Sequence, residues 1–316
     1  MRPDRGVHGP ERPTLRDVEA LNRVFSEAFT DRYSRDGLTG VRVPHLNPLV
    51  WRYAIEDAGD GAMIWRDADG GIAGFNMVHR SGSEGWMGPI AVRPDLQGSG
   101  LGTAMVRAGI EWLERAGAGT IGLETMPRTV ENIGFYSRLG FVPGPLTVTM
   151  VRDLAQAPVR ALERLSEAGA LEAALAECRT LTGSLVPGVD FTRELALTHE
   201  LALGDTALVR RNGALAGFVL WHAAPLAAGR PRDELRVLKI VATDLAVFGE
   251  LIDLVQGVAE TERVRRVAVR CQTAHADAYL QLVAQGFRVH WTDLRMTLRH
   301  RPEQATRGVV MSNWEI

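Results

Sequence analysis

Apolar positions in the first half of the chain follow two spacings, one typical of helices and one of strands. Thr14-Leu15-Arg16-Asp17 resembles a capping box, and apolar residues recur at helical spacing from Val18 to Phe29. Two short apolar runs, 62–66 and 72–79, flank the turn signal Ala68-Asp69-Gly70-Gly71 and predict a hairpin. We therefore predict a mixed α/β unit that opens with a helix and continues into antiparallel strands.

A glycine-rich turn joins the next predicted strand to the next predicted helix. The apolar run from Trp86 to Val92 predicts a buried strand, and apolar residues return at helical spacing from Ala104 to Leu113. Between them lie three glycines, at positions 98, 100 and 102. Such a turn leaves backbone amides unpaired at the start of a helix, where the helix dipole also favours negative charge. The pattern predicts a site for a phosphate or pyrophosphate group.

The spacing of the glycines distinguishes between the known phosphate loops. A Walker A loop ends in Gly-Lys-Ser/Thr, but Gly102 is followed by Thr103 and Ala104. A dinucleotide-binding turn has the pattern G-x-G-x-x-G, whereas this turn has G-x-G-x-G. The pattern that fits is Gln-x-x-Gly-x-Gly, from Gln97 to Gly102. It resembles the acyl-CoA pyrophosphate loop of the GNAT N-acetyltransferases.

Two further segments extend this resemblance. Ile90 to Asp95 matches the family's strand-to-loop segment ahead of the glycines, and Thr129 to Phe141 resembles its later helix, with Tyr136 opening the usual Tyr-x-x-x-Gly-Phe. The resemblance covers roughly residues 5 to 152. It implies an acetyl-CoA-dependent N-acetyltransferase, with acetyl-CoA as cosubstrate and the primary amine of a small molecule as acceptor.

The second half repeats the order of the first. Ala216-Gly217-Phe218 stands in a predicted hairpin as Ala73-Gly74-Phe75 does, and Gly286-Phe287 repeats Gly140-Phe141 about 146 residues later. The other repeated elements are predicted strands at 205–211, 215–222, 235–241 and 264–271 and a helix near 276–284. We predict an α/β protein with two tandem GNAT-like domains, each a mixed, mostly antiparallel twisted sheet flanked by helices.

We place the catalytic domain at residues 1–152, a linker at 153–160, a degenerate GNAT-like domain at 161–300 and a C-terminal tail at 301–316. A helix over 162–181 is expected to open the second domain. The repeat aligns Arg270 with Glu124 and Leu282 with Tyr136, and the segment 243–249 holds a single glycine. The second domain is therefore expected to be structural or to shape the substrate site, which leaves one active site per chain.

The resemblance assigns roles to residues of the first half. In the family two strands splay apart, so that freed backbone groups pair with the pantetheine arm. Tyr136 becomes the general acid, since a phenol with a pKa near 10 stays protonated at neutral pH. Glu124 becomes the base, directly or through water, although a carboxylate is a poor base unless burial raises its pKa. Glu84 and Glu131 are weaker alternatives for the base.

The expected cofactor-binding residues are Ile90, Ala91, Val92, Gln97, Gly98, Ser99, Gly100, Leu101, Gly102, Thr103, Thr129 and Asn132.

Thr129 stands where many relatives carry an asparagine, seven residues before the tyrosine, and Asn132 lies four before it. The segment from Asp31 to Trp51 is expected to form the acceptor wall, because the family usually builds it there. Two other functions fit the same residues. One is a non-catalytic acyl-CoA-binding module for regulation or assembly, and the other is a protein or peptide N-acetyltransferase.

Composition and charge limit the partners and the cellular location that we expect for this protein. The formal net charge of −2 provides no basic field for nucleic acid, and the most apolar stretch, 214–228, is too short to span a bilayer. The first residues lack the apolar core of a signal peptide, and the two cysteines have no metal-binding spacing. We expect a cytoplasmic protein, monomeric or homodimeric, that binds neither metal, membrane nor nucleic acid.

Overall fold

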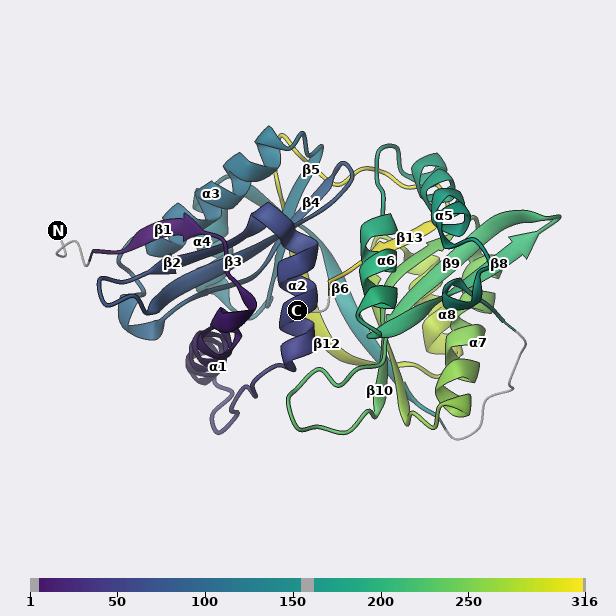
Figure 1. Ribbon diagram of the computed structural model, residues 1–316, viewed down its shortest axis with the longest axis horizontal. Helices are drawn as coiled ribbons and strands as arrows, with labels where there is room; N and C mark the ends of the chain where they lie inside the picture. The colour runs from purple at the N-terminus through teal and green to yellow at the C-terminus, as the bar shows by residue number, and fades with distance from the viewer. Residues whose placement is uncertain (1–5, 155–161, 315–316) are drawn as a thin grey trace.

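The computed structural model describes residues 6–154 and 162–314, which fold around one continuous sheet (Figure 1). The elements of the first half are β1 (His8–Glu11), α1 (Val18–Arg35), α2 (Pro48–Ala58), β2 (Ala62–Arg66), β3 (Ile72–Ser81), β4 (Glu84–Val92), α3 (Leu101–Arg115), β5 (Thr120–Thr125), α4 (Val130–Arg138) and β6 (Phe141–Asp153). Those of the second half are β7 (Glu163–Arg164), α5 (Leu171–Leu185), α6 (Thr192–Glu200), β8 (Gly204–Arg211), β9 (Ala214–His222), β10 (Glu234–Ala242), α7 (Leu245–Thr261), β11 (Arg266–Gln272), α8 (Ala276–Ala284), β12 (Arg288–Leu298) and β13 (Val309–Ser312).

The predicted elements and their repetition are present in the structure. The capping box forms at Thr14, and the hairpin β2–β3 has its counterpart in β8–β9. The order helix, helix, hairpin, strand, helix, strand, helix, strand occurs in both halves, as the duplication requires. The protein has the α/β fold that the sequence predicts, built from two GNAT-like units.

The expected helix over 162–181 is wrong at its start. Residues 163–164 form β7 against β8, a 3-10 turn follows, and α5 begins only at Leu171. Gly169 lies just before α5, and glycine is a poor residue for a helix interior. Most of the expected linker, residues 155–160, lies outside the described residues.

Two helices were not foreseen. In α2, Asn47 caps the first turn and Pro48 occupies its first position, so the Asn-Pro pair was an available start signal. Helix α2 falls partly within the segment 31–51 that we assigned to the acceptor wall. Helix α6 (Thr192–Glu200) is its counterpart, and the two helices pack against each other between the halves.

The two units exchange their last long strands. Strand β12 of the second half lies between β5 and β6, with Arg295 opposite Glu124. Strand β6 of the first half continues into the second half and pairs with β11, with Thr149 opposite Arg270. Because of this exchange, one sheet runs through both units, and the division near residue 152 does not separate two independent sheets.

Strands β4 and β5 pair only along their first four residues. The parallel register runs from Glu84 opposite Thr120 to Met87 opposite Leu123, and β4 then diverges from β5. On its other side β4 keeps its pairing with β3 up to Val92. The expected splay between two strands is therefore present beside the glycine-rich turn.

The matching splay of the second half is occupied by the chain itself. Strands β10 and β11 pair from Glu234 to Val237, and from Lys239 to Ala242 the strand β10 pairs instead with β13. The expected C-terminal tail is thus part of the sheet, in the place where the first half leaves the edge of β4 unpaired.

Candidate active site

The glycine-rich turn has the geometry of an anion site. Gly98 and Gly100 have φ of 74° and 99°, a left-handed conformation that favours glycine, and Gly100 is the N-cap of α3. The Gln97 side chain donates a hydrogen bond to the Val92 carbonyl at 3.2 Å, which ties the turn to the end of β4. The first amides of α3 have no partner one turn earlier, so the turn can present them to a pyrophosphate.

The splay leaves backbone groups of β4 unpaired beside the glycine-rich turn. Ile90, Ala91 and Val92 pair with β3 on one side only, and beyond Met87 no described strand pairs with the edge of β4 that faces β5. Their backbone groups can therefore pair with an extended ligand, as a strand would. Pro89, which has no N–H to donate, lies where the strands separate.

Tyr136 lies on α4, close to the glycine-rich turn. A Cβ atom at Gly102 would lie 3.7 Å from the ring of the neighbouring Phe135, so α4 borders the turn. The Tyr136 ring packs against Phe141, with ring centroids 6.1 Å apart, and burial raises the pKa of its phenol to about 12. Tyr136 therefore stays protonated throughout the physiological pH range.

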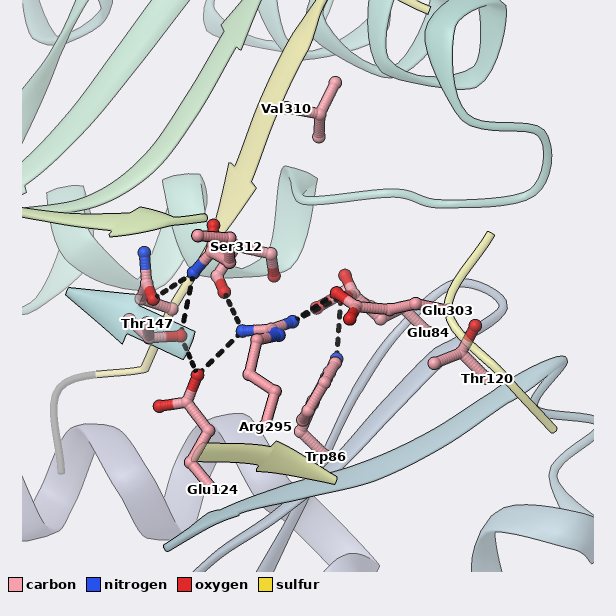
Figure 2. A network of polar contacts seen from close by, with 12 residues as sticks. Glu84, Trp86, Thr120, Glu124, Thr147, Arg295, Glu303, Val310 and Ser312 are labelled. Atoms are coloured by element: carbon pink, nitrogen blue, oxygen red, sulfur yellow. Dashed lines mark hydrogen bonds and ion pairs between the residues drawn. The ribbon is translucent and has the colours of Figure 1, made fainter. Parts of the chain in front are cut away.

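Glu124 is held in a network of charged groups (Figure 2). Arg295 Nη1 donates to its carboxylate at 2.8 Å, and Arg270 and the Thr147 hydroxyl donate as well. Burial raises the pKa of Glu124, but the two guanidinium charges and the Thr147 hydrogen bond outweigh burial and leave the pKa below its ordinary value. The raised pKa that direct base catalysis would require is not present in this arrangement.

Arg270 and Arg295 come from the second half and were not among the expected site residues. Arg270 Nη2 also donates to Asp293 at 2.9 Å, and near it the Trp291 ring lies 6.1 Å from that of Tyr33 on α1. The surroundings of Arg270 therefore combine α1 with β11 and β12. The repeat aligned Arg270 with Glu124, which was the one available signal for this contact.

Thr129 and Asn132, both expected to contact the cofactor, make side-chain hydrogen bonds near the start of α4. The Thr129 hydroxyl donates to Asp36 at 2.5 Å, and Asn132 donates weakly to Thr125 at 3.4 Å. Thr129 is fully buried, and its hydrogen bond joins the start of α4 to the end of α1. The structure thus gives Thr129 a role in holding the acceptor wall against α4.

The alternative carboxylates lie away from the splay. Glu84 accepts a hydrogen bond from the Trp86 indole at 2.6 Å at the closed end of the strand pair, and burial raises its pKa. Glu131 has an exposed side chain 3.5 Å from Arg32. Of the three carboxylates, Glu124 is the one that follows directly on the last β4–β5 pair.

Comparison with known proteins supports the assignment of the first half. The sequence model of the acetyltransferase (GNAT) family matches residues 20–141. The first half is a GNAT acetyltransferase domain.

The chain is 38% identical over 131 residues to a mycothiol acetyltransferase of Pseudarthrobacter chlorophenolicus, and the match covers 40% of this chain and 39% of that protein. It is 33% identical over 131 residues to the chloroplastic serotonin N-acetyltransferase 2 of Oryza sativa subsp. japonica, covering 41% of this chain and 58% of that protein. The matches therefore span between about two fifths and three fifths of these relatives.

Solved structures extend the likeness to both halves. A tandem GNAT protein from the clavulanic acid biosynthesis pathway superposes with a TM-score of 0.61 at 15% identity, covering 94% of this chain and all of that one. At this identity the match shows the fold alone. The superposition over both halves is consistent with two GNAT-like units in this chain.

The second GNAT-like unit differs at the place of its cofactor loop. Asp244 caps α7, and its carboxylate accepts a hydrogen bond from the Val247 amide at 2.9 Å. This carboxylate occupies the helix start where the first unit presents amides. The Asp244 carboxylate and β13 thus occupy the positions that correspond to the glycine-rich turn and the splay of the first unit.

The described helices are too short or too polar to cross a membrane. The described residues also contain no group of three or more His, Cys, Asp or Glu side chains that could hold a metal ion.

Proposed function

We propose that this chain transfers the acetyl group of acetyl-CoA to the primary amine of a small molecule, at a single site in the first half. The observation that carries the proposal is the junction of the glycine-rich turn, the β4–β5 splay and Tyr136 in one GNAT domain. The amides of Gly98, Gly100, Gly102 and Thr103 would hold the pyrophosphate, since those of Ser99 and Leu101 donate within the turn. The backbone of Ile90 to Val92 would hold the pantetheine arm.

In the transfer, the amine nitrogen attacks the thioester carbonyl carbon, the C–S bond breaks and an amide forms. Tyr136 is the proposed acid, because its phenol carries a proton that it can donate to the departing sulfur. Because Tyr136 is largely buried, this hydrogen bond would form in a medium of lowered dielectric, where it is stronger.

The proton lost by the amine is proposed to leave through water toward Glu124. A carboxylate with a lowered pKa is a weak base, so the larger effect of Glu124 is to fix Arg270 and Arg295. We therefore assign Glu124 as a base acting only through water.

The acceptor is proposed to approach between α1 and the ends of β11 and β12. Tyr33 and Trp291 supply aromatic surface there, and Asp293 supplies negative charge that favours a cationic amine. One relative bears the name serotonin N-acetyltransferase, and an arylalkylamine suits such a surface.

Thiol release measured with acetyl-CoA and a panel of amines tests this proposal. The panel contains serotonin, spermidine, glucosamine and a short peptide with a free N-terminus. We expect release with at least one small amine at a rate well above that of the peptide. CoA binding without turnover of any amine would support a binding module instead, and equal rates with the peptide would favour peptide acetylation.

A further inference from the structure

A cavity of about 560 Å³ lies between the two units, on the side of Arg295 that faces residues 303–312. Its floor is formed by Glu84, Thr120 and Arg295, at the closed end of the β4–β5 pair and on β12. The segment from Glu303 to Ser312 and residues of the second half complete its walls. This volume lies within the range of about 300–1,000 Å³ typical of small-molecule sites.

The cavity is separate from the proposed transfer site. The Arg295 guanidinium stacks on the Trp86 ring at 3.8 Å, and both side chains are almost fully buried. Trp86 in turn covers β5, since a Cβ atom at Gly122 would lie 2.5 Å from its ring. Glu124 bonds to Nη1 of the same guanidinium, so Arg295 lies between Glu124 and the cavity (Figure 2). Gln272 of the lining reaches Glu124 only through the Thr147 hydroxyl.

Two buried polar atoms of the lining have no hydrogen-bond partner among the described residues. They are Arg295 Nε, a donor, and Gln272 Oε1, an acceptor. Arg295 is 2% exposed and Gln272 is 4% exposed, although their other polar atoms are bonded to Glu124, Glu303 and Asn313. A buried donor or acceptor without a partner is costly, so a ligand that supplied both partners would be stabilised by them.

The rest of the lining indicates the chemistry of that ligand. Glu303 places a carboxylate beside Arg295, with 2.6 Å between Oε1 and Nη2, so opposite charges adjoin at one end. Val186, Val189 and Val310 line the cavity with aliphatic side chains. A ligand with a positive group, a negative group and a short aliphatic part matches this lining.

We propose that the cavity binds a small aliphatic α-amino acid. Its carboxylate accepts a hydrogen bond from Arg295 Nε, its ammonium group donates to Gln272 Oε1 and Glu303, and its side chain packs against the three valines. The site does not depend on the proposed acetyl transfer, and its ligand is not the acceptor.

Calorimetric titration of the full chain without acetyl-CoA tests the site. L-leucine is the probe, and 3-methylbutylamine and 4-methylpentanoate are its matched analogues, each lacking one charged group. We expect leucine to bind and each analogue to bind roughly tenfold more weakly or worse, since each leaves one buried polar atom without a partner.

Ala305→Trp provides a variant that fills the cavity from its exposed rim, and Ala173→Trp on the exposed face of α5 is the control. Leucine binding should fall at least tenfold in the first and stay unchanged in the second, with equal melting temperatures. Absence of leucine binding at millimolar concentration, equal binding of the analogues, or unchanged binding in Ala305→Trp would overturn the proposal. Thiol release from acetyl-CoA driven by leucine would identify it as an acceptor and contradict a separate site.

Discussion

Arg270 on β11 donates a hydrogen bond to Glu124 on β5, the residue that holds the equivalent position in the other unit. The strand exchange makes this contact possible. Arg295 lies opposite Glu124, and Arg270 lies opposite Thr149, so the two pairs are related by the internal repeat. A position that carries a carboxylate in one unit therefore carries its counter-ion in the other.

Removing the Glu124 charge should destabilise the protein. Glu124→Gln leaves Arg270 and Arg295 without their shared carboxylate, and we expect the free energy of unfolding at pH 7 to fall by about 3 kcal/mol. Urea unfolding measures this loss. Glu131→Gln, on the exposed face of α4, is the control and should change the free energy by less than about 0.5 kcal/mol.

The free energy of unfolding that is lost in Glu124→Gln should become smaller as the pH falls. The pKa of Glu124 lies below its ordinary value of 4.5, so the folded state holds its proton less tightly than the unfolded state does. Its stabilising contribution is therefore present above pH 4.5 and is lost as the pH falls through the lower, folded value. The difference between wild type and Glu124→Gln should narrow on acidification. A difference that widens would contradict the ion-pair account.

Tyr136→Phe tests the proposed acid. General acid catalysis contributes about 10²–10⁴-fold, and we expect kcat to fall by roughly that factor with little change in the KM for acetyl-CoA. Tyr279→Phe on α8 is the matched control, because it removes a partly buried tyrosine hydroxyl from the equivalent helix of the second unit. Equal kcat values for the two variants would remove Tyr136 from the chemistry.

The pH profile of the transfer follows from the same residue. Burial raises the pKa of Tyr136 to about 12, so the phenol stays protonated where an ordinary tyrosine would begin to ionise. Because a primary amine near pKa 10 loses its proton as the pH rises, kcat/KM for the acceptor should increase from pH 6 to about pH 10 without a descending limb. A decline near pH 9 that disappears in Tyr136→Phe would contradict this prediction.

Local sequence signals were sufficient for the elements that carry the cofactor site. The capping box, the hairpins and the glycine-rich turn each depend on neighbours along the chain, and the structure has them where the sequence predicts them. The strand exchange could not be predicted in this way, because the pattern of β6 and β12 does not specify which strand each pairs with. Arg295 was missed because no strand was predicted over residues 288–298, and because the burial of a charged residue depends on long-range pairing.

The conformation of the glycine-rich turn provides a test of cofactor binding. Gly100 has φ of 99° with open space where a Cβ would lie, so Gly100→Val strains the backbone without a steric clash. The strain costs about 1–3 kcal/mol. If the backbone shifts to relieve this strain, the amides of the glycine-rich turn move away from the pyrophosphate. Acetyl-CoA affinity should fall at least tenfold by calorimetry. Gly213→Val, in the β8–β9 turn at φ of 81°, has the same backbone strain and should leave affinity unchanged.

We propose one acyl-CoA site per chain, in the first half. Titration of the full chain with CoA by calorimetry tests it most directly. We expect a stoichiometry of one, with an affinity at least tenfold weaker in Gly100→Val and unchanged in Asp244→Ala, whose change affects the loop of the second unit. Two equivalent sites, or an affinity that is unchanged in Gly100→Val and weaker in Asp244→Ala, would contradict it.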